Sequence, residues 1–134
     1  MRNYVPCWDK IGISRDRYLE LLRFCRQYDE WKLRADSMIG IHGQSLDGQP
    51  HGNGMGDPVA AAAERRYTLL GKMALVEECA AGVSGGQWAT ALIMNICLGI
   101  PYAKIPAVVL PSSYRAAFFH ARKEFFVLLD EKRK

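Results

Sequence analysis

The sequence predicts an all-α fold, a compact helical domain in which two long helices joined by a Gly-rich loop precede a C-terminal helix-turn-helix-like unit. Apolar residues recur at three- and four-residue spacing in several segments, whereas sustained alternation of apolar and polar residues is absent. Glycine and proline interrupt the helical pattern at a few defined places. The length of 134 residues suits a single domain, 1–134, with residues 1–86 as a helical scaffold and residues 87–134 as the C-terminal part.

The first helix is expected from about Ser14 to Met38. Ser14 is a favourable N-cap, and Asp16 places negative charge in the first turn, where the helix dipole favours it. Apolar residues then follow at helical spacing: Tyr18, Leu21, Leu22, Cys25 and Tyr28. Residues 1–13 are predicted to form an irregular lead-in that packs on the core.

The long loop is predicted over residues 40–57, which hold six glycines and Pro50. Two histidines and two aspartates occur here, His42, His51, Asp47 and Asp57, but their spacing matches no zinc or calcium signature. The segment also lacks the G-x-x-x-x-G-K-[ST] pattern of a phosphate-binding loop. We therefore expect a surface loop without a metal or a cofactor.

Three further helices are expected after this loop. Asp57-Pro58 is a typical helix start, and the second long helix should run through Ala80 until Gly82, Gly85 and Gly86 end it. A third helix, residues 87–98, should stop at Gly99, a short piece follows over residues 101–105, and the final helix should open at Ser112 or Ser113. No Asp, Glu, Lys or Arg occurs from residue 79 to 103, yet the compact apolar part, 88–100, is shorter than the roughly 20 residues that a bilayer requires. It is predicted as a buried core helix, and no membrane association is expected.

The net charge of the chain comes entirely from its C-terminal end. Residues 1–100 hold 11 Lys/Arg and 11 Asp/Glu, whereas residues 101–134 hold seven and three, which accounts for the formal charge of +4. A cationic end on an otherwise balanced domain attracts polyanions, and nucleic acid is the commonest of these inside cells.

The final helix divides into an apolar stripe and a polar, cationic side. Tyr114, Phe118, Ala121, Phe125 and Leu128 form the stripe that is expected to bury. Basic and hydroxyl side chains off the stripe are the candidate DNA-binding residues: Ser112, Ser113, Arg115, His120, Arg122 and Lys123. A plain solvated surface helix would show the same division, so both interpretations stay open.

The sequence offers little for catalysis, and we expect a protein that is not an enzyme. Two of the three histidines lie in the predicted loop, and no H-E-x-x-H motif, nucleophile elbow or spaced carboxylate pair occurs. The four cysteines are widely spaced without a C-x-x-C pair, which favours reduced, buried thiols. The beginning of the chain has no apolar stretch of signal-peptide length, so a cytoplasmic location is expected.

The chain resembles small proteins encoded by prophages of Gram-positive bacteria. The likeness is carried by Y-L-E-L-L-R-F-C-R-Q-Y-D-E-W at residues 18–31, by D-G-Q-P-H-G at 47–52 with G-D-P at 56–58, and by F-F-H-A-R-K-E-F-F-V-L-L at 118–129. Some of these proteins are similar to phage late-gene transcription regulators of the RinA and ArpU type, whose C-terminal part is a sigma-region-4-like helix-turn-helix. The resemblance implies that Arg115, Arg122 and Lys123 contact duplex DNA, with RNA polymerase as a further partner.

Three hypotheses follow for the function. The first is a prophage DNA-binding protein that regulates transcription, contacts duplex DNA through its C-terminal basic helix and forms a homo-oligomer. The second is a phage assembly or packaging component, such as a small terminase-like oligomer. The third is a protein-interaction adaptor that binds no nucleic acid.

Overall fold

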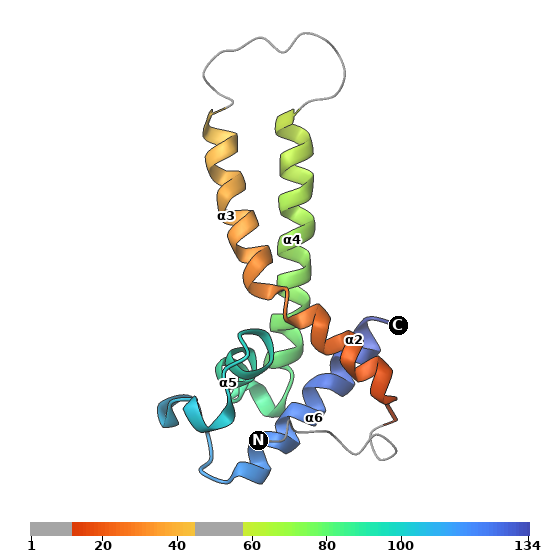
Figure 1. The fold of residues 1–134 in the computed structure, drawn as a ribbon, viewed down its shortest axis with the longest axis vertical. Coiled ribbons are helices and arrows are strands. Elements are labelled where there is room, and N and C mark those ends of the chain that lie inside the picture. Colours follow the sequence, from red (N-terminus) through yellow and green to blue (C-terminus); the bar gives the residue numbers. More distant parts are fainter. Residues whose placement is uncertain (1–11, 45–57) are drawn as a thin grey trace.

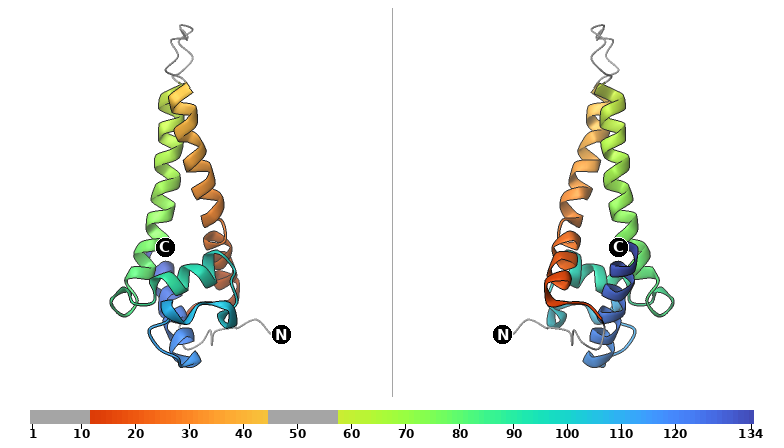
Figure 2. Two further views of the ribbon diagram at one scale, coloured as in Figure 1. Left: turned by 90° about the vertical axis from the view of Figure 1, so that its left-hand side faces the viewer. Right: turned by 90° about the vertical axis from the view of Figure 1, so that its right-hand side faces the viewer.

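The computed structural model describes residues 12–44 and 58–134, and within these ranges it is helical without any strand, which confirms the all-α class. The main helices are α2 (Arg15–Cys25), α3 (Tyr28–Gln44), α4 (Pro58–Ala81), α5 (Ala89–Leu92) and α6 (Arg115–Lys132). The short helical turns are η1 (Ser84–Gly86), η2 (Ile93–Cys97), η3 (Tyr102–Lys104) and η4 (Ala107–Val109). In Figure 1, α3 and α4 rise side by side as a long hairpin from a base that contains α2, α5 and α6, and both views in Figure 2 agree.

The predicted first helix is two helices, α2 and α3, because the chain bends at Arg26 and Gln27. Ser14 caps α2 as expected, since its hydroxyl accepts a hydrogen bond from the Arg17 amide at 3.1 Å. At the bend, Arg26 Nε donates to the Ile96 carbonyl at 2.7 Å. This tertiary bond keeps the end of α2 on the base, while α3 leaves along α4.

The arm formed by α3 and α4 is held together by polar and stacking contacts near its base. Lys72 Nζ lies 5.7 Å from the ring centroid of Trp31, and Arg66 Nε donates to the Ala35 carbonyl at 3.2 Å. The Tyr28 hydroxyl binds the Glu77 carboxylate, and burial, together with this bond, raises the pKa of Tyr28. The hairpin arrangement therefore rests on side chains from both helices.

The first residues of the predicted loop are helical. Helix α3 continues to Gln44, so residues 40–44 are helical, and the prediction of a loop over them was wrong. A glycine inside a helix costs only about 1 kcal/mol relative to alanine, which neighbouring helical turns can offset. Residues 45–57, with Asp47, His51 and Asp57, lie outside the described residues. The structure therefore leaves the rest of the predicted loop untested.

Helix α4 matches its predicted bounds closely. It begins at Pro58 and ends at Ala81. Ser84, Gly85 and Gly86 then adopt positive φ values of 44°, 77° and 89°. Glycine adopts this conformation without steric cost, whereas it is uncommon for a serine.

The third helix is less regular than predicted. It is α-helical only over α5 and continues as the π-helical turn η2, until Gly99 with φ of 74° ends it at the predicted position. The Leu98 amide donates to the Ile93 carbonyl, and Asn95 Nδ2 donates to the Ile100 carbonyl at 2.9 Å. The η3 and η4 turns each follow a proline and fill much of the connection to α6.

The hydrophobic core lies in the base of the molecule. Its largest fully buried side chains are Phe118, Phe125, Phe126, Leu21, Leu92, Ile96 and Leu129. They come from α2, α5, η2 and α6, so α6 is central to the fold. Among the helices of residues 12–44 and 58–134, none combines the length and apolarity that crossing a bilayer requires.

Candidate nucleic-acid interface

Helix α6 buries more of its circumference than the sequence pattern suggested. Its buried residues are Phe118, Ala121, Arg122, Phe125, Phe126 and Leu129. Tyr114, which was predicted to bury, is 76% exposed. The reason is position, because α6 extends past the core at its N-terminal end and is covered only from about Ala117 onward. Tyr114 and Phe118 were predicted to share one buried face, but only Phe118 is covered by the core.

Arg122 is buried, and its assignment as a DNA-binding residue was wrong. Only 6% of the residue is exposed. Its Nε donates to Asn95 Oδ1 at 2.9 Å and its Nη1 donates to the Tyr18 hydroxyl at 2.7 Å. The guanidinium also lies over the rings of Tyr18 and Phe126, at 5.6 and 5.1 Å from their centroids. A buried charge is tolerated when hydrogen bonds and aromatic faces replace water, and Arg122 has both.

Arg115 shares a helix face with Arg122, two turns earlier, but it is exposed. Its guanidinium carbon lies 5.2 Å from the Tyr102 ring centroid and 4.9 Å from that of Phe119. The Tyr102 and Phe119 centroids are 5.8 Å apart. Stacking holds the guanidinium plane in place while solvent still reaches it, which is a favourable arrangement for binding phosphate.

Of the other four predicted site residues, two precede α6, Ser112 and Ser113, and two lie within it, His120 and Lys123. Ser113 is exposed, and the Ser112 hydroxyl accepts a hydrogen bond from the Tyr114 amide at 3.2 Å. His120 is exposed, with Nε2 3.5 Å from a Glu124 carboxylate oxygen. Lys123 is half-buried. Ser112 and Ser113 thus precede Arg115 closely in the chain, whereas His120 already faces a carboxylate.

The charge distribution singles out one region of the base, residues 98–123, which we call the basic end. No Asp or Glu occurs from residue 79 to 123, and Lys104 and Arg115 are exposed cations there. The carboxylates Asp130 and Glu78 lie at the other end of α6, where Asp130 pairs with Arg17 at 2.7 Å and Glu78 with Lys132 at 3.8 Å. The basic end is therefore the part of the base best suited to an anionic partner.

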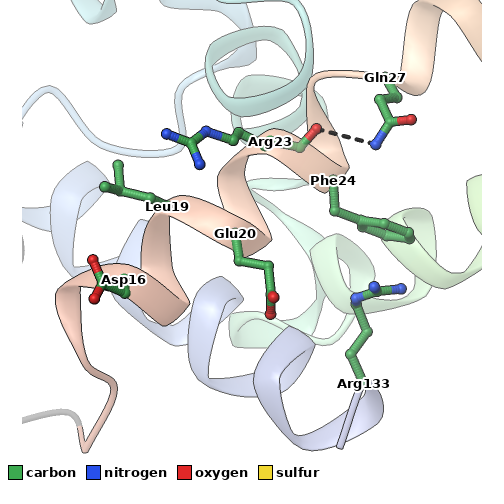
Figure 3. Close-up of a pocket in the computed structure, with 7 residues that line it drawn as sticks. All are labelled: Asp16, Leu19, Glu20, Arg23, Phe24, Gln27 and Arg133. Atoms are coloured by element: carbon green, nitrogen blue, oxygen red, sulfur yellow. Dashed lines mark hydrogen bonds between the residues drawn. The ribbon is translucent and has the colours of Figure 1, made fainter.

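An open groove on the other side of the base has a mixed character (Figure 3). It is lined by α2 and the C-terminal residues: Asp16, Leu19, Glu20, Arg23, Phe24, Gln27 and Arg133. Arg133 covers the Phe24 ring, with its guanidinium carbon 3.7 Å from the centroid, and Gln27 Nε2 donates to the Arg23 carbonyl at 3.4 Å. Two carboxylates beside two guanidiniums give a polyanion little net attraction here.

The cysteines are free and inert where the structure describes them. Cys25, Cys79 and Cys97 are buried and unbridged, as predicted, while Cys7 lies outside the described residues. Burial raises the pKa of Cys79 to about 11, and a hydrogen bond with Cys97, together with burial, raises the pKa of Cys25. Within residues 12–44 and 58–134, no group of three His, Cys, Asp or Glu side chains could hold a metal ion.

Two residues of the buried network were missed by sequence reasoning. Tyr18 was assigned to the apolar spacing of the first helix, and Asn95 lies in the segment 88–100 that was predicted as a buried core helix. A polar side chain between Met94 and Ile96, in a segment expected to bury, requires a hydrogen-bond partner. That requirement was the available signal for a buried Arg122.

Comparison with known proteins gives no relative on which to base a function. The chain matches no protein-family model, no curated protein and no solved structure.

Proposed function

We propose that this chain is a non-enzymatic DNA-binding protein that contacts the phosphates of duplex DNA through its basic end and regulates transcription in the manner of prophage regulators. The observation that carries the proposal is the exposed, stacked Arg115 in a stretch of 45 residues, 79–123, without a carboxylate. The exposed Lys104 and the partly exposed Lys123 supply further positive charge. RNA polymerase is the proposed protein partner.

Because Arg122 is buried, we expect a single chain to bind DNA weakly. With Arg122 inside the core, about two to three cations remain to neutralise phosphates, so the logarithm of affinity should fall with that of salt with a slope of about −2 to −3. The residues between η2 and α6 also form two proline-led turns where a helix-turn-helix has a short turn. We therefore propose phosphate contact at the N-terminal end of α6, without relying on the helix-turn-helix-like unit.

The test is a fluorescence anisotropy titration against a random duplex at two salt concentrations. Arg115→Ala is compared with Arg65→Ala, which removes an equal charge from an exposed position on α4. We expect Arg115→Ala to weaken binding about fivefold or more and Arg65→Ala to leave it within about twofold, because only Arg115 lies on the proposed phosphate path. Equal effects of the two variants would contradict a local site.

A second candidate, an oligomeric assembly or packaging component, is favoured by the outer face of α4. Apolar residues recur there at alternating spacings of three and four: Ala60, Ala63, Tyr67, Leu70 and Ala74. Tyr67 is 80% exposed and Leu70 is 37% exposed, and Gly71 leaves open space beside them. This spacing is that of a helix seam, and a second copy of the chain is the proposed occupant.

Solution mass separates the two candidates. A Tyr67→Glu variant should convert an oligomer to monomers if the seam joins copies, because it places a charge at the centre of an apolar contact. A closed ring of many copies favours packaging, whereas a monomer or dimer favours regulation. An unchanged mass in the Tyr67→Glu variant would exclude this face as the seam.

A further inference from the structure

The basic end carries exposed apolar and aromatic side chains, Val108 and Tyr114, that the DNA-binding proposal has not used. We define the stacking patch as Tyr114 and Arg115 together with Tyr102 and Phe119, the two rings under Arg115. Val108 is 90% exposed and Tyr114 is 76% exposed, although both side chains are large and apolar or aromatic. Exposed residues of this kind beside a cation point to a surface that receives a partner.

The patch is anchored to the core on one side. Tyr102 lies 5.0 Å, centroid to centroid, from Phe118, which is fully buried. Phe119 packs edge-on against Phe118 at 5.0 Å, and Arg115 lies over both Tyr102 and Phe119. Because these groups are already ordered, binding to them loses less side-chain entropy than binding to a free surface arginine.

The chemistry of the patch matches unpaired nucleotides. A nucleotide offers a phosphate for a guanidinium and an aromatic face for a tyrosine ring, and single-strand binders combine these two contacts. In duplex DNA the base faces are already occupied by neighbouring bases, so Tyr114 could gain nothing from them. A protein partner would also cover Val108 and Tyr114, but it would not by itself require a region of cations without carboxylates.

We propose that Tyr114 stacks on an unpaired base while Arg115 binds the neighbouring phosphate, so that single-stranded DNA binds more tightly than duplex. The inference rests on the DNA-binding function proposed above and specifies the form of DNA that this site prefers. A strand opened from its partner, rather than an intact duplex, is then the tightest ligand.

The experiment compares three labelled probes of equal length at low salt: a single strand, the same strand annealed to its complement, and a strand with abasic sites through its middle. We expect the single strand to bind the wild-type protein about tenfold more tightly than either of the other probes. Tyr114→Ala should remove that tenfold advantage and leave the duplex and abasic affinities within about twofold. Tyr114→Phe should retain it, because stacking needs the ring and not the hydroxyl.

The controls separate this inference from the function on which it rests. Arg115→Ala should weaken all three probes, since each carries phosphates. Equal affinity of wild-type protein for single strand and duplex, or an equal loss for both in Tyr114→Ala, overturns the stacking inference while duplex binding stands. Absence of binding to every probe overturns both proposals, and a change in solution mass in Tyr114→Ala would instead assign the patch to a contact between copies.

Discussion

Replacing Arg122 should destabilise the fold strongly, because this side chain links three elements from inside the core. Its guanidinium binds Asn95 of η2 and Tyr18 of α2, and its exposed fraction is 6%. Hydrogen bonds from a charged donor contribute about 1.5–3 kcal/mol each, and removing Arg122 leaves the half-buried Asn95 oxygen without that donor. For Arg122→Ala we therefore expect a loss of about 3–5 kcal/mol in the free energy of unfolding.

The more informative variant is Arg122→Met, which keeps an unbranched apolar side chain and avoids most of the cavity. It should lose about 2–3 kcal/mol, because both hydrogen bonds disappear but the packing over Phe126 is largely retained. Urea unfolding followed by circular dichroism measures this as a midpoint about 1–2 M lower. The control is Arg115→Ala, which removes an exposed arginine from the same helix and should cost less than about 1 kcal/mol.

The reasoning is refuted if Arg122→Met unfolds at the same urea concentration as wild type, or if it matches Arg115→Ala. Either result would mean that the hydrogen bonds of Arg122 add little net stability to the fold. Until that is measured, binding experiments should leave Arg122 intact, since its replacement would confuse loss of contact with loss of fold.

Further predictions concern two glycines and the buried thiols. Gly71→Ala should raise stability by up to about 1 kcal/mol, because it lies in α4 with open space around the added Cβ. Gly99→Ala should lower stability by about 1 kcal/mol or more, because φ is +74° and the Cβ would lie 3.3 Å from Arg26 Nη1. The melting temperatures of the two variants should therefore move in opposite directions. In a Cys7→Ser background, a thiol reagent at pH 8 should modify no described cysteine until the protein unfolds, and rapid labelling of the native protein would contradict the burial. The urea midpoint should also fall as pH rises from the ordinary thiol pKa of 9.0 towards about 11, because the unfolded chain loses the Cys79 proton at a lower pH than the folded protein. Cys79→Ala should reduce that fall.

Local sequence signals predicted some of the helix ends and missed the tertiary contacts. The start of α4 at Pro58 and the stop of the third helix at Gly99 follow from backbone preferences that a single residue carries. The bend at Arg26 could not be predicted in this way, because it accompanies a hydrogen bond to Ile96, 70 positions away. Long-range contacts of this kind are decided by the packed structure, not by the residues beside the bend.

The candidate site shows the same limit in its charged residues. Arg115 and Arg122 are alike in chemistry and share a helix face, so a pattern that sorts residues by polarity assigns them together. They differ because α2 and η2 cover Arg122, to which they supply Tyr18 and Asn95, whereas Arg115 is exposed. The sequence did contain one signal for the burial of Arg122. It lies four residues from both Phe118 and Phe126, so the three side chains share one face of the helix.

The most direct test of the account is a map of amide chemical shifts in the ¹⁵N-labelled protein during titration with a short single-stranded oligonucleotide. The account predicts that the perturbed amides cluster in η3, η4 and the first turns of α6, around Tyr102, Tyr114 and Arg115. Perturbations centred on the α3–α4 arm, or on the groove between Phe24 and Arg133, would contradict it.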